Sequence, residues 1–435
     1  MKRIDLLEGL DPLTVQGRIA QAAGIVLEGY GTATTIGELC EVTRDDGSAP
    51  LTAEVVGFRG DRIMLMPLGD MHGIGPASRL MTKGRQASVT VGPKLLGRVL
   101  DGLGHPLDEK GPIEAEGEYP LYQAPLNPLH RRRITQPLDL GVRAINGLLT
   151  CGLGQKIGIF AGAGVGKSIL LGMLSRNVVA DVSVIALIGE RGREVKEFLE
   201  RDLRPGGMQR TVVIAATSDQ PPLVRIRGAF LATAIAEYFR DQGRHVLLLM
   251  DSLTRFAQGQ REVGLAIGEP PTSKGYTPSV FSLLPRLLER VGTCEGSGTL
   301  TGLYTILVEG DDLSDPIADS ARSILDGHIV LSRDLASRNH YPAIDVLQST
   351  SRVMHGIITP AHDAAARAVV ELMATYQRAE DLITLGAYKP GVNPKLDRAV
   401  GMIEAIHAYL KQEKDECASF PASVEALIQL AGQPG

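Results

Sequence analysis

Short apolar runs separated by turn residues dominate the chain after residue 15. The clearest runs are Arg18–Val26, Ala53–Phe58 and Arg62–Met66, and Gly- and Asp-containing turns divide them. Several short strands at regular spacing are typical of a small barrel or sandwich. We therefore predict a β-barrel domain over residues 16–92, preceded by a lead segment, residues 1–15.

The pattern changes between residues 145 and 355, where continuous apolar runs alternate with helical segments such as Ala229–Arg240. The apolar runs are Ile157–Phe160, Val182–Ile188, Thr211–Ala216, His245–Met250 and Leu303–Val308. Unbroken apolar runs are expected of parallel strands that are covered on both faces. We predict a doubly wound α/β domain whose bounds, residues 93–360, include a Gly/Pro-rich connection at 93–132.

Two further patterns complete the predicted architecture. Asp315 and Pro316 are typical of the start of a helix, and Gly327 then predicts its end. Helical periodicity over residues 361–435 predicts a small C-terminal helical domain. Its expected helices are Ala364–Thr384, Pro394–Lys414 and Ala422–Leu430.

Composition adds limits on compartment and partners. Glycine is in excess, with 50 of 435 residues, whereas tryptophan is absent and the net charge is −5. This charge supplies no strong global field for nucleic acid. The four cysteines lie far apart without a C-x-x-C pair, which favours reduced thiols over disulfides or a zinc site. No apolar run reaches the length of a membrane span, and the N-terminus lacks the apolar core of a signal peptide, so we expect a cytoplasmic protein.

A phosphate-binding loop is the sharpest motif in the sequence. The segment AGAGVGKS, residues 161–168, follows an apolar strand and precedes a helical run, and it departs from G-x-x-x-x-G-K-[ST] only in its first residue. Its glycines allow backbone N–H groups to surround phosphate oxygens, and the helix N-terminus adds its positive dipole end. Lys167 would reach the β- and γ-phosphates of ATP, and Ser168 would ligate Mg²⁺. The residues predicted to bind the nucleotide are Gly162, Ala163, Gly164, Val165, Gly166, Lys167, Ser168 and Ile169.

Two carboxylates are candidates for the chemistry of hydrolysis. Asp251 ends a buried strand, as expected for the acid beside Mg²⁺, although it could instead cap the following helix. Glu190 follows another buried strand and could polarise the attacking water, with Glu194 as its rival. Arg191 could contact the γ-phosphate or a neighbouring subunit, or form a plain salt bridge.

Three longer segments carry a family resemblance. GERGREVKEF, LLLMDSLTRFAQGQREVGLAIGEPP and DGHIVLSRDLASRNHYPAIDVLQSTSRVM closely resemble the ATPases of bacterial type III protein export, which are relatives of the catalytic subunits of rotary ATP synthases. The resemblance extends from about residue 16 to 415. GVRAINGLLTCGLGQKIGIFAGAGVGKS and GEPPTSKGYTPSVF are more similar to the flagellar branch of this family than to the injectisome branch.

The resemblance implies a homohexameric ring with active sites at the subunit interfaces. It assigns Lys167, Ser168, Glu190 and Asp251 the roles given above. It also implies that Arg352 is an arginine finger donated to the neighbouring nucleotide, and that Tyr341 packs on the adenine. Without the resemblance, Arg352 would be interpreted as a surface cation and Tyr341 as a core aromatic.

The implied partners are those of an export apparatus at the inner membrane. They are a stator-like regulatory protein, a central stalk protein, membrane proteins of the export gate, and complexes of substrates with chaperones. The lead segment 1–15 would be a short docking helix or a frayed terminus. The loop Gly268–Tyr276 resembles the segment that lines the central channel, and the alternative is a connecting loop.

We expect an ATP-hydrolysing motor that promotes unfolding and entry of export substrates at the flagellar gate, with the injectisome as the alternative setting. A ring helicase of the transcription-terminator type would need an RNA-binding barrel, and the acidic balance and scarce aromatics argue against it, so no nucleic-acid partner is expected. A non-catalytic subunit of a rotary ATPase would be expected to lack a carboxylate at position 190, so the presence of Glu190 argues against this alternative.

Overall fold

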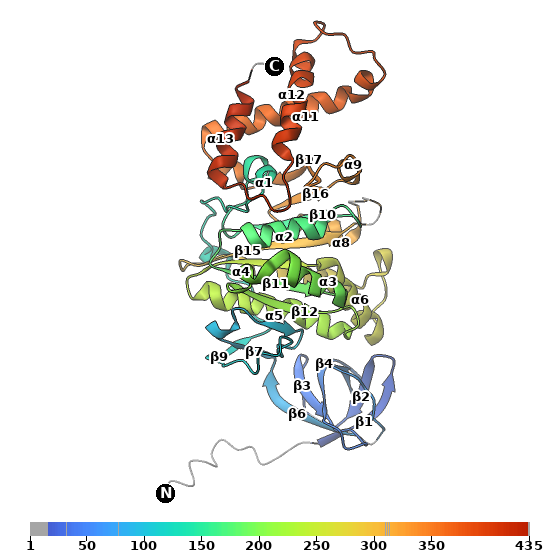
Figure 1. The fold of residues 1–435 in the computed structure, drawn as a ribbon. Helices are drawn as coiled ribbons and strands as arrows, with labels where there is room; N and C mark the ends of the chain where they lie inside the picture. The colour runs from blue at the N-terminus through green and yellow to red at the C-terminus, as the bar shows by residue number, and fades with distance from the viewer. Residues whose placement is uncertain are drawn as a thin grey trace.

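A barrel, a central sheet with its helices and a helical bundle follow one another along the molecule (Figure 1). The computed structural model describes residues 16–433 except 32, 77, 309, 311 and 313, and it leaves aside the side chains of 85, 86, 204 and 205. The lead segment 1–15, with its expected docking helix, lies outside the described residues. Among the described helices, none is both long and apolar enough to cross a membrane.

The predicted β-barrel is confirmed as a closed barrel of antiparallel strands in the order β1-β2-β5-β4-β3-β6. The strands are β1 (Gln16–Ala23), β2 (Val26–Tyr30), β3 (Glu38–Val42), β4 (Leu51–Arg59), β5 (Arg62–Pro67) and β6 (Arg79–Gln86). The single run predicted at Arg18–Val26 is wrong, because Gly24 adopts a φ of 61° and turns the chain between β1 and β2. β7 (Ser88–Val91) lies outside the barrel and pairs with β9 (Gly117–Pro120).

The predicted parallel sheet is also confirmed, with the strand order β17-β16-β10-β15-β13-β11-β12-β8. All pairs along this path are parallel except β17, which runs antiparallel to β16, and the short β14 pairs antiparallel with β15. The strands are β8 (Val99–Asp101), β10 (Lys156–Ala161), β11 (Val182–Ile188), β12 (Thr211–Ala216), β13 (His245–Asp251), β14 (Gly292–Thr293), β15 (Thr299–Leu307), β16 (Gly327–Leu331) and β17 (Ile344–Ser351).

Helices cover both faces of this sheet, as predicted from the unbroken apolar strands. In β11, Val184 and Ala186 join a core with α5, α6, α7 and α8, whereas Ile185 and Leu187 join a second core with α1 and α2. This alternation follows from the two-residue period of a strand. The helices are α1 (Arg143–Leu148), α2 (Lys167–Asn177), α3 (Gly192–Glu197), α4 (Arg204–Met208), α5 (Pro222–Asp241), α6 (Leu253–Ile267), α7 (Pro278–Leu288), α8 (Pro316–Ile324) and α9 (Arg333–Ser337).

The start of α8 agrees with the sequence, but its predicted end does not. Asp315 caps the helix by accepting from the backbone N–H groups of Ile317 and Ala318. Gly327 is not the cap at the other end, because it opens β16. A side chain at Gly327 would lie 2.5 Å from the carbonyl oxygen of Thr350, so this glycine permits the close approach of β17.

The C-terminal helices pack on the second core of the sheet, through α11, α12 and α13. The helices of this region are α10 (Met354–Ile357), α11 (Pro360–Thr384), α12 (Pro394–Leu410) and α13 (Phe420–Ala431). The prediction that a helix continues to Lys414 is wrong, because α12 ends at Leu410. Residues of the segment 411–416 instead line one cavity together with Gly166 and the first turns of α2.

Candidate functional site

The phosphate-binding loop lies between β10 and α2, at the carboxyl end of the parallel strands. Gly164 and Gly166 have φ values of 78° and 90°, a backbone conformation that L side chains rarely adopt. A Cβ at Gly164 would meet nothing within 4 Å, so this face of the loop is open. Ser168 is exposed in the first turn of α2. The loop therefore offers backbone N–H groups and a helix N-terminus to an anion of the size of a phosphate.

Three predicted residues converge beside this loop. The Nζ atom of Lys167 lies 2.5 Å from Oδ1 of Asp251 and 3.4 Å from Oε1 of Glu190. The side chains of the three residues are between 7% and 14% exposed. Lys167 opens α2 after the phosphate-binding loop, Asp251 ends β13 and Glu190 follows β11, so all three lie beyond the carboxyl ends of parallel strands of the sheet. The sheet topology thus brings together a cation and two carboxylates that lie up to 84 positions apart in the sequence.

Thr305 is a part of this cluster that sequence reasoning missed. Its hydroxyl donates a hydrogen bond of 2.6 Å to Oδ1 of Asp251, the same oxygen that Lys167 contacts. Thr305 lies within β15, the strand next to β13. A threonine in a strand carries no motif, so only the pairing of these strands reveals the contact. Ser252, and not Asp251, caps α6 by accepting from the N–H of Arg255, so the alternative role of Asp251 as helix cap is wrong.

Burial and charge shift the acidity of two members of the cluster. Burial and the neighbouring charge of Asp251 raise the pKa of Glu190 to about 7, although Lys167 opposes this shift. Burial disfavours the charged form of Lys167, but Asp251 and Glu190 outweigh burial and raise its pKa above the ordinary value. A cationic lysine and a carboxyl group that titrates near neutral pH suit a site that binds phosphate and moves a proton.

A cavity of about 400 Å³ adjoins the phosphate-binding loop. Its walls come from the first turns of α2, including Ile169, from residues 339–342 and from residues 411–416. The ring of Tyr341 lies against the loop, because a Cβ at Gly166 would approach it to 3.2 Å. An aromatic ring beside a phosphate-binding loop suits the base of a nucleotide. The sequence did not predict the wall at 411–416, because residues 411–414 were predicted to be helical.

The two predicted arginines lie outside this cluster. The side chain of Arg191 is 78% exposed and forms an ion pair of 3.5 Å with Glu194, the rival carboxylate. Arg352 is exposed after the end of β17, and its Nη2 atom donates to the carbonyl oxygen of Arg322 at 3.3 Å. The structure of one chain therefore places neither arginine beside Lys167.

The loop Gly268–Tyr276 connects α6 with α7 and is tied to the start of α8. Lys274 lies 3.3 Å from Asp315 and 3.6 Å from Asp312. Tyr276 is buried, and the guanidinium of Arg261 lies 5.4 Å from its ring centre. These contacts give the loop a defined position, and its predicted role as a channel lining stays a prediction.

Comparisons with known families match all three parts of the described chain. Residues 19–80 match the β-barrel domain and residues 141–351 the nucleotide-binding domain of the ATP synthase alpha/beta family. Residues 358–429 match the T3SS EscN ATPase C-terminal domain. The predicted resemblance is thereby confirmed.

Individual relatives cover nearly the whole chain. The flagellum-specific ATP synthase of Bacillus subtilis is 50% identical over 99% of this chain and 98% of its own. The type 3 secretion system ATPase of Xanthomonas euvesicatoria is 49% identical over 95% of this chain and 93% of its own. The assembled ATPase EscN of the enteropathogenic E. coli type III secretion system is 45% identical, with a TM-score of 0.91 over 96% of this chain and all of that one. EscN has also been solved in complex with its central stalk EscO, and that structure has a TM-score of 0.88 to this chain.

Proposed function

The chain belongs to the family of flagellum-specific and type III secretion ATPases, and from this premise we propose that it is the ATP-hydrolysing ring motor of flagellar protein export. Membership of this family makes it an ATPase. The observation that carries the proposal is the convergence of Lys167, Glu190 and Asp251 beside an open phosphate-binding loop. In this setting, ATP hydrolysis drives the unfolding and entry of export substrates at the gate.

The residues of the site divide the work of hydrolysis between binding and proton transfer. The phosphate-binding loop holds the phosphates, and Lys167 moves from its two carboxylates to the β- and γ-phosphate oxygens. Ser168 and Asp251 fit Mg²⁺, because a hydroxyl and a carboxylate next to substrate phosphates are the ligands this ion usually takes in proteins. Bound Mg²⁺ neutralises the charge on the phosphates. Glu190 orients the attacking water and accepts its proton.

Glu190 is the better candidate for this proton transfer than Glu194. The Glu190 carboxylate lies next to Lys167, whereas Glu194, which also interacts with Glu190, is more exposed and pairs with Arg191. The role of Arg191 as a contact to the γ-phosphate, or to a neighbouring subunit, would require it to leave this ion pair. In the proposed mechanism, this contact of Arg191 is secondary to the roles of Lys167, Glu190 and Asp251.

A homohexameric ring would complete the site from a second subunit. Arg352, which lies away from Lys167 of its own chain, would serve as the arginine finger of the neighbouring site. The relative EscN is known in complex with a central stalk, and we propose a corresponding stalk protein as a partner here. The other proposed partners are a stator-like regulatory protein, membrane proteins of the export gate and chaperone-bound substrates. The ring would then lie in the cytoplasm against the export apparatus of the inner membrane.

A gene deletion distinguishes the flagellar setting from the injectisome setting. The flagellar proposal expects loss of motility and of filament assembly, both restored by the wild-type gene but not by Glu190→Gln. The second candidate, an injectisome ATPase, is favoured by the 49% identity to the Xanthomonas protein. If the protein is an injectisome ATPase, the deletion should abolish host-directed secretion and leave motility intact. That result would overturn the flagellar proposal and leave the ATPase assignment in place.

A further inference from the structure

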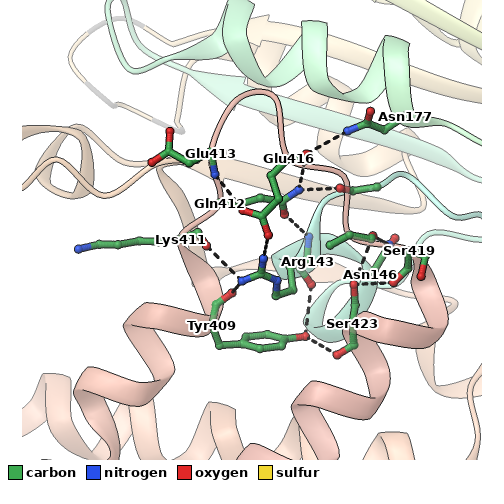
Figure 2. Close-up of polar contacts among 12 residues, drawn as sticks. Arg143, Asn146, Asn177, Tyr409, Lys411, Gln412, Glu413, Glu416, Ser419 and Ser423 are labelled. Carbon is green, nitrogen blue, oxygen red and sulfur yellow. Dashed lines mark hydrogen bonds and ion pairs between the residues drawn. The ribbon is translucent and has the colours of Figure 1, made fainter.

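Residues 411–416 form one wall of the cavity beside Tyr341, although they follow a helix of the C-terminal domain. Figure 2 shows that a dense set of polar contacts holds this wall against α1. At the centre of these contacts is Gln412, which is only 5% exposed although it lies in a loop. A buried amide must satisfy its hydrogen-bonding groups, so its partners define what it does.

All hydrogen-bonding groups of the Gln412 side chain are used on the protein. Its Oε1 atom accepts from the backbone N–H of Arg143 at 2.8 Å. Its Nε2 atom donates to the carbonyl oxygens of Gly141 and Glu416, at 2.8 and 2.9 Å. An amide offers one oxygen and two N–H donors. Gln412 is therefore committed to the wall and to α1, and it has no donor left with which to recognise a base.

The backbone of the same residue holds the aromatic ring of the pocket. The N–H of Gln412 donates to the carbonyl oxygen of Tyr341 at 3.0 Å. Through its side chain and its main chain, Gln412 thus connects Tyr341 with the segment 141–143, which leads into the ATPase core.

A second tether runs parallel to the first. Arg143 forms an ion pair with Glu416, and its Nη1 atom donates to the carbonyl oxygens of Tyr409 and Lys411 at 3.2 and 3.3 Å. The other carboxylate oxygen of Glu416 accepts from the N–H of Glu413 at 3.2 Å. The wall is therefore fixed at its start, at its middle and at its end (Figure 2).

We propose that Gln412 is the positioning residue of the base pocket, which sets the affinity for adenine nucleotides without taking part in the chemical step. The inference rests on the proposed assignment of this cavity to the adenine. None of the contacts described for Gln412 reaches Lys167, Glu190 or Asp251. Loss of Gln412 would let the wall and Tyr341 move away from the base, while the phosphate-binding loop and its carboxylates keep their geometry.

Steady-state ATPase kinetics of the full-length assembled protein test the proposal. In Gln412→Ala, we expect the KM for ATP to rise about tenfold, the effect of losing several buried hydrogen bonds, with kcat within about twofold of the wild type. Inorganic tripolyphosphate, which has no base, should inhibit the variant and the wild type with the same constant. This probe separates weaker binding of the base from weaker binding of the phosphates. If the role of Gln412 were merely structural, its loss would change the binding of both.

Matched variants keep the test decisive. Gln412→Met preserves the volume of the side chain while removing its polar contacts, so it answers the question if Gln412→Ala does not fold. Glu416→Ala removes a partly exposed member of the second tether and should raise the KM about threefold. Gln429→Ala, an exposed glutamine of α13, should leave both constants unchanged.

Two results would overturn the role of Gln412. One is a KM for ATP within twofold of the wild type in both Gln412 variants. The other is a parallel rise in the KM for ATP and in the inhibition constant of tripolyphosphate, which would indicate general damage. Tyr341→Ala separates these failures from failure of the pocket assignment, because a KM that is unchanged in Tyr341→Ala would mean that the cavity does not hold the base.

Discussion

Tyr341 and Arg352 flank the same edge strand of the central sheet, β17, and so lie beyond its opposite ends. β17 runs antiparallel to β16, so that Ile344 pairs with Leu331 near the phosphate-binding loop and Ser351 pairs with Gly327 at the far end of the strand. Eight residues of strand span about 25 Å. One strand therefore separates Tyr341, which lines the cavity of its own chain, from the exposed Arg352, which we propose as the finger of a neighbouring site.

This relationship predicts that two inactive variants restore each other. Arg352→Ala removes the finger and should lower kcat by about 10³-fold or more, and Lys167→Ala should abolish activity through the loss of phosphate contacts. If subunits mix at random in equal amounts, about one site in four receives an intact loop from one subunit and an intact finger from the next. The ATPase activity of the mixture should reach about that fraction of the wild type.

The controls are the two variants measured separately, each at the concentration that it has in the mixture. Activity of the mixed sample that equals the sum of the separate samples would contradict donation of Arg352 between subunits. Wild-type specific activity should also fall on dilution, because a dissociated subunit loses the finger of its neighbour.

Glu190→Gln should separate nucleotide binding from turnover. The amide keeps the size and polarity of the side chain but cannot accept a proton from water, so kcat should fall by about 10²- to 10⁴-fold. Binding of a fluorescent ATP analogue should stay within a few-fold of the wild type. Glu194→Gln changes the rival carboxylate, which pairs with Arg191 and also interacts with Glu190, and it should retain most activity. The reverse ranking of the two variants would assign the chemistry to Glu194.

The raised pKa of Glu190 predicts that kcat/KM falls as the pH is lowered below about 7. Its pKa is raised to about 7 in the free protein, and only the ionised carboxylate can accept a proton. The value of kcat/KM should therefore be constant above this pH and fall about tenfold per unit below it. The measurement is kcat/KM between pH 5.5 and 8.5 at saturating Mg²⁺. Residual activity of Glu190→Gln should lack this inflection, and an inflection that persists in the variant would belong to another group.

Much of the site could be predicted because each part has a local pattern. The strand β10, the glycines at 162, 164 and 166 and Lys167 are contiguous in the sequence, so their chemistry does not depend on long-range contacts. Glu190 and Asp251 follow unbroken apolar runs, and the carboxyl ends of parallel strands meet at one edge. The fold class followed from the same runs, since continuous apolar strands need helices on both faces.

The parts that could not be predicted depend on contacts between distant segments. Gly327 resembles a helix stop in sequence, but its function is to let β17 approach β16 closely. Residues 411–414 continue the helical pattern of α12, yet they follow the end of the helix, and Gln412 is hydrogen-bonded to the segment 141–143. The role of Thr305 depends on the pairing of β13 with β15. Local propensity is a weak prior in each case, and the tertiary contacts decide.

Thr305→Val should weaken the binding of Mg²⁺ and leave the rate of the chemical step nearly unchanged. Valine matches the shape of threonine but removes the hydroxyl that donates to Asp251, and partners of this kind commonly contribute tenfold or more to metal affinity. The concentration of Mg²⁺ that gives half-maximal activity should rise about tenfold, with kcat at saturating Mg²⁺ nearly unchanged. Thr301→Val in the same strand, which changes a hydroxyl far from Asp251, is the control. Equal effects of both substitutions would indicate a packing defect in β15.

The buried ion pair of Glu237 with Arg290 predicts a large loss of stability from a single substitution outside the nucleotide site. Arg290 has a fully buried side chain, and its Nε and Nη2 atoms contact the two carboxylate oxygens of Glu237 at 3.0 and 2.5 Å. Glu237→Ala leaves this guanidinium buried without its counterion, which typically costs about 3–5 kcal/mol in the free energy of unfolding. Urea denaturation should reveal this loss.

The exposed pair of Arg193 with Glu197 provides the control, since Glu197→Ala should change the same free energy by less than about 1 kcal/mol. Replacing both buried partners, as in Glu237→Leu with Arg290→Met, should recover much of the loss, because no unpaired charge then stays in the core. A double variant as unstable as Glu237→Ala would show that Arg290 matters through its hydrogen bond to the carbonyl oxygen of Leu121 and not through its charge.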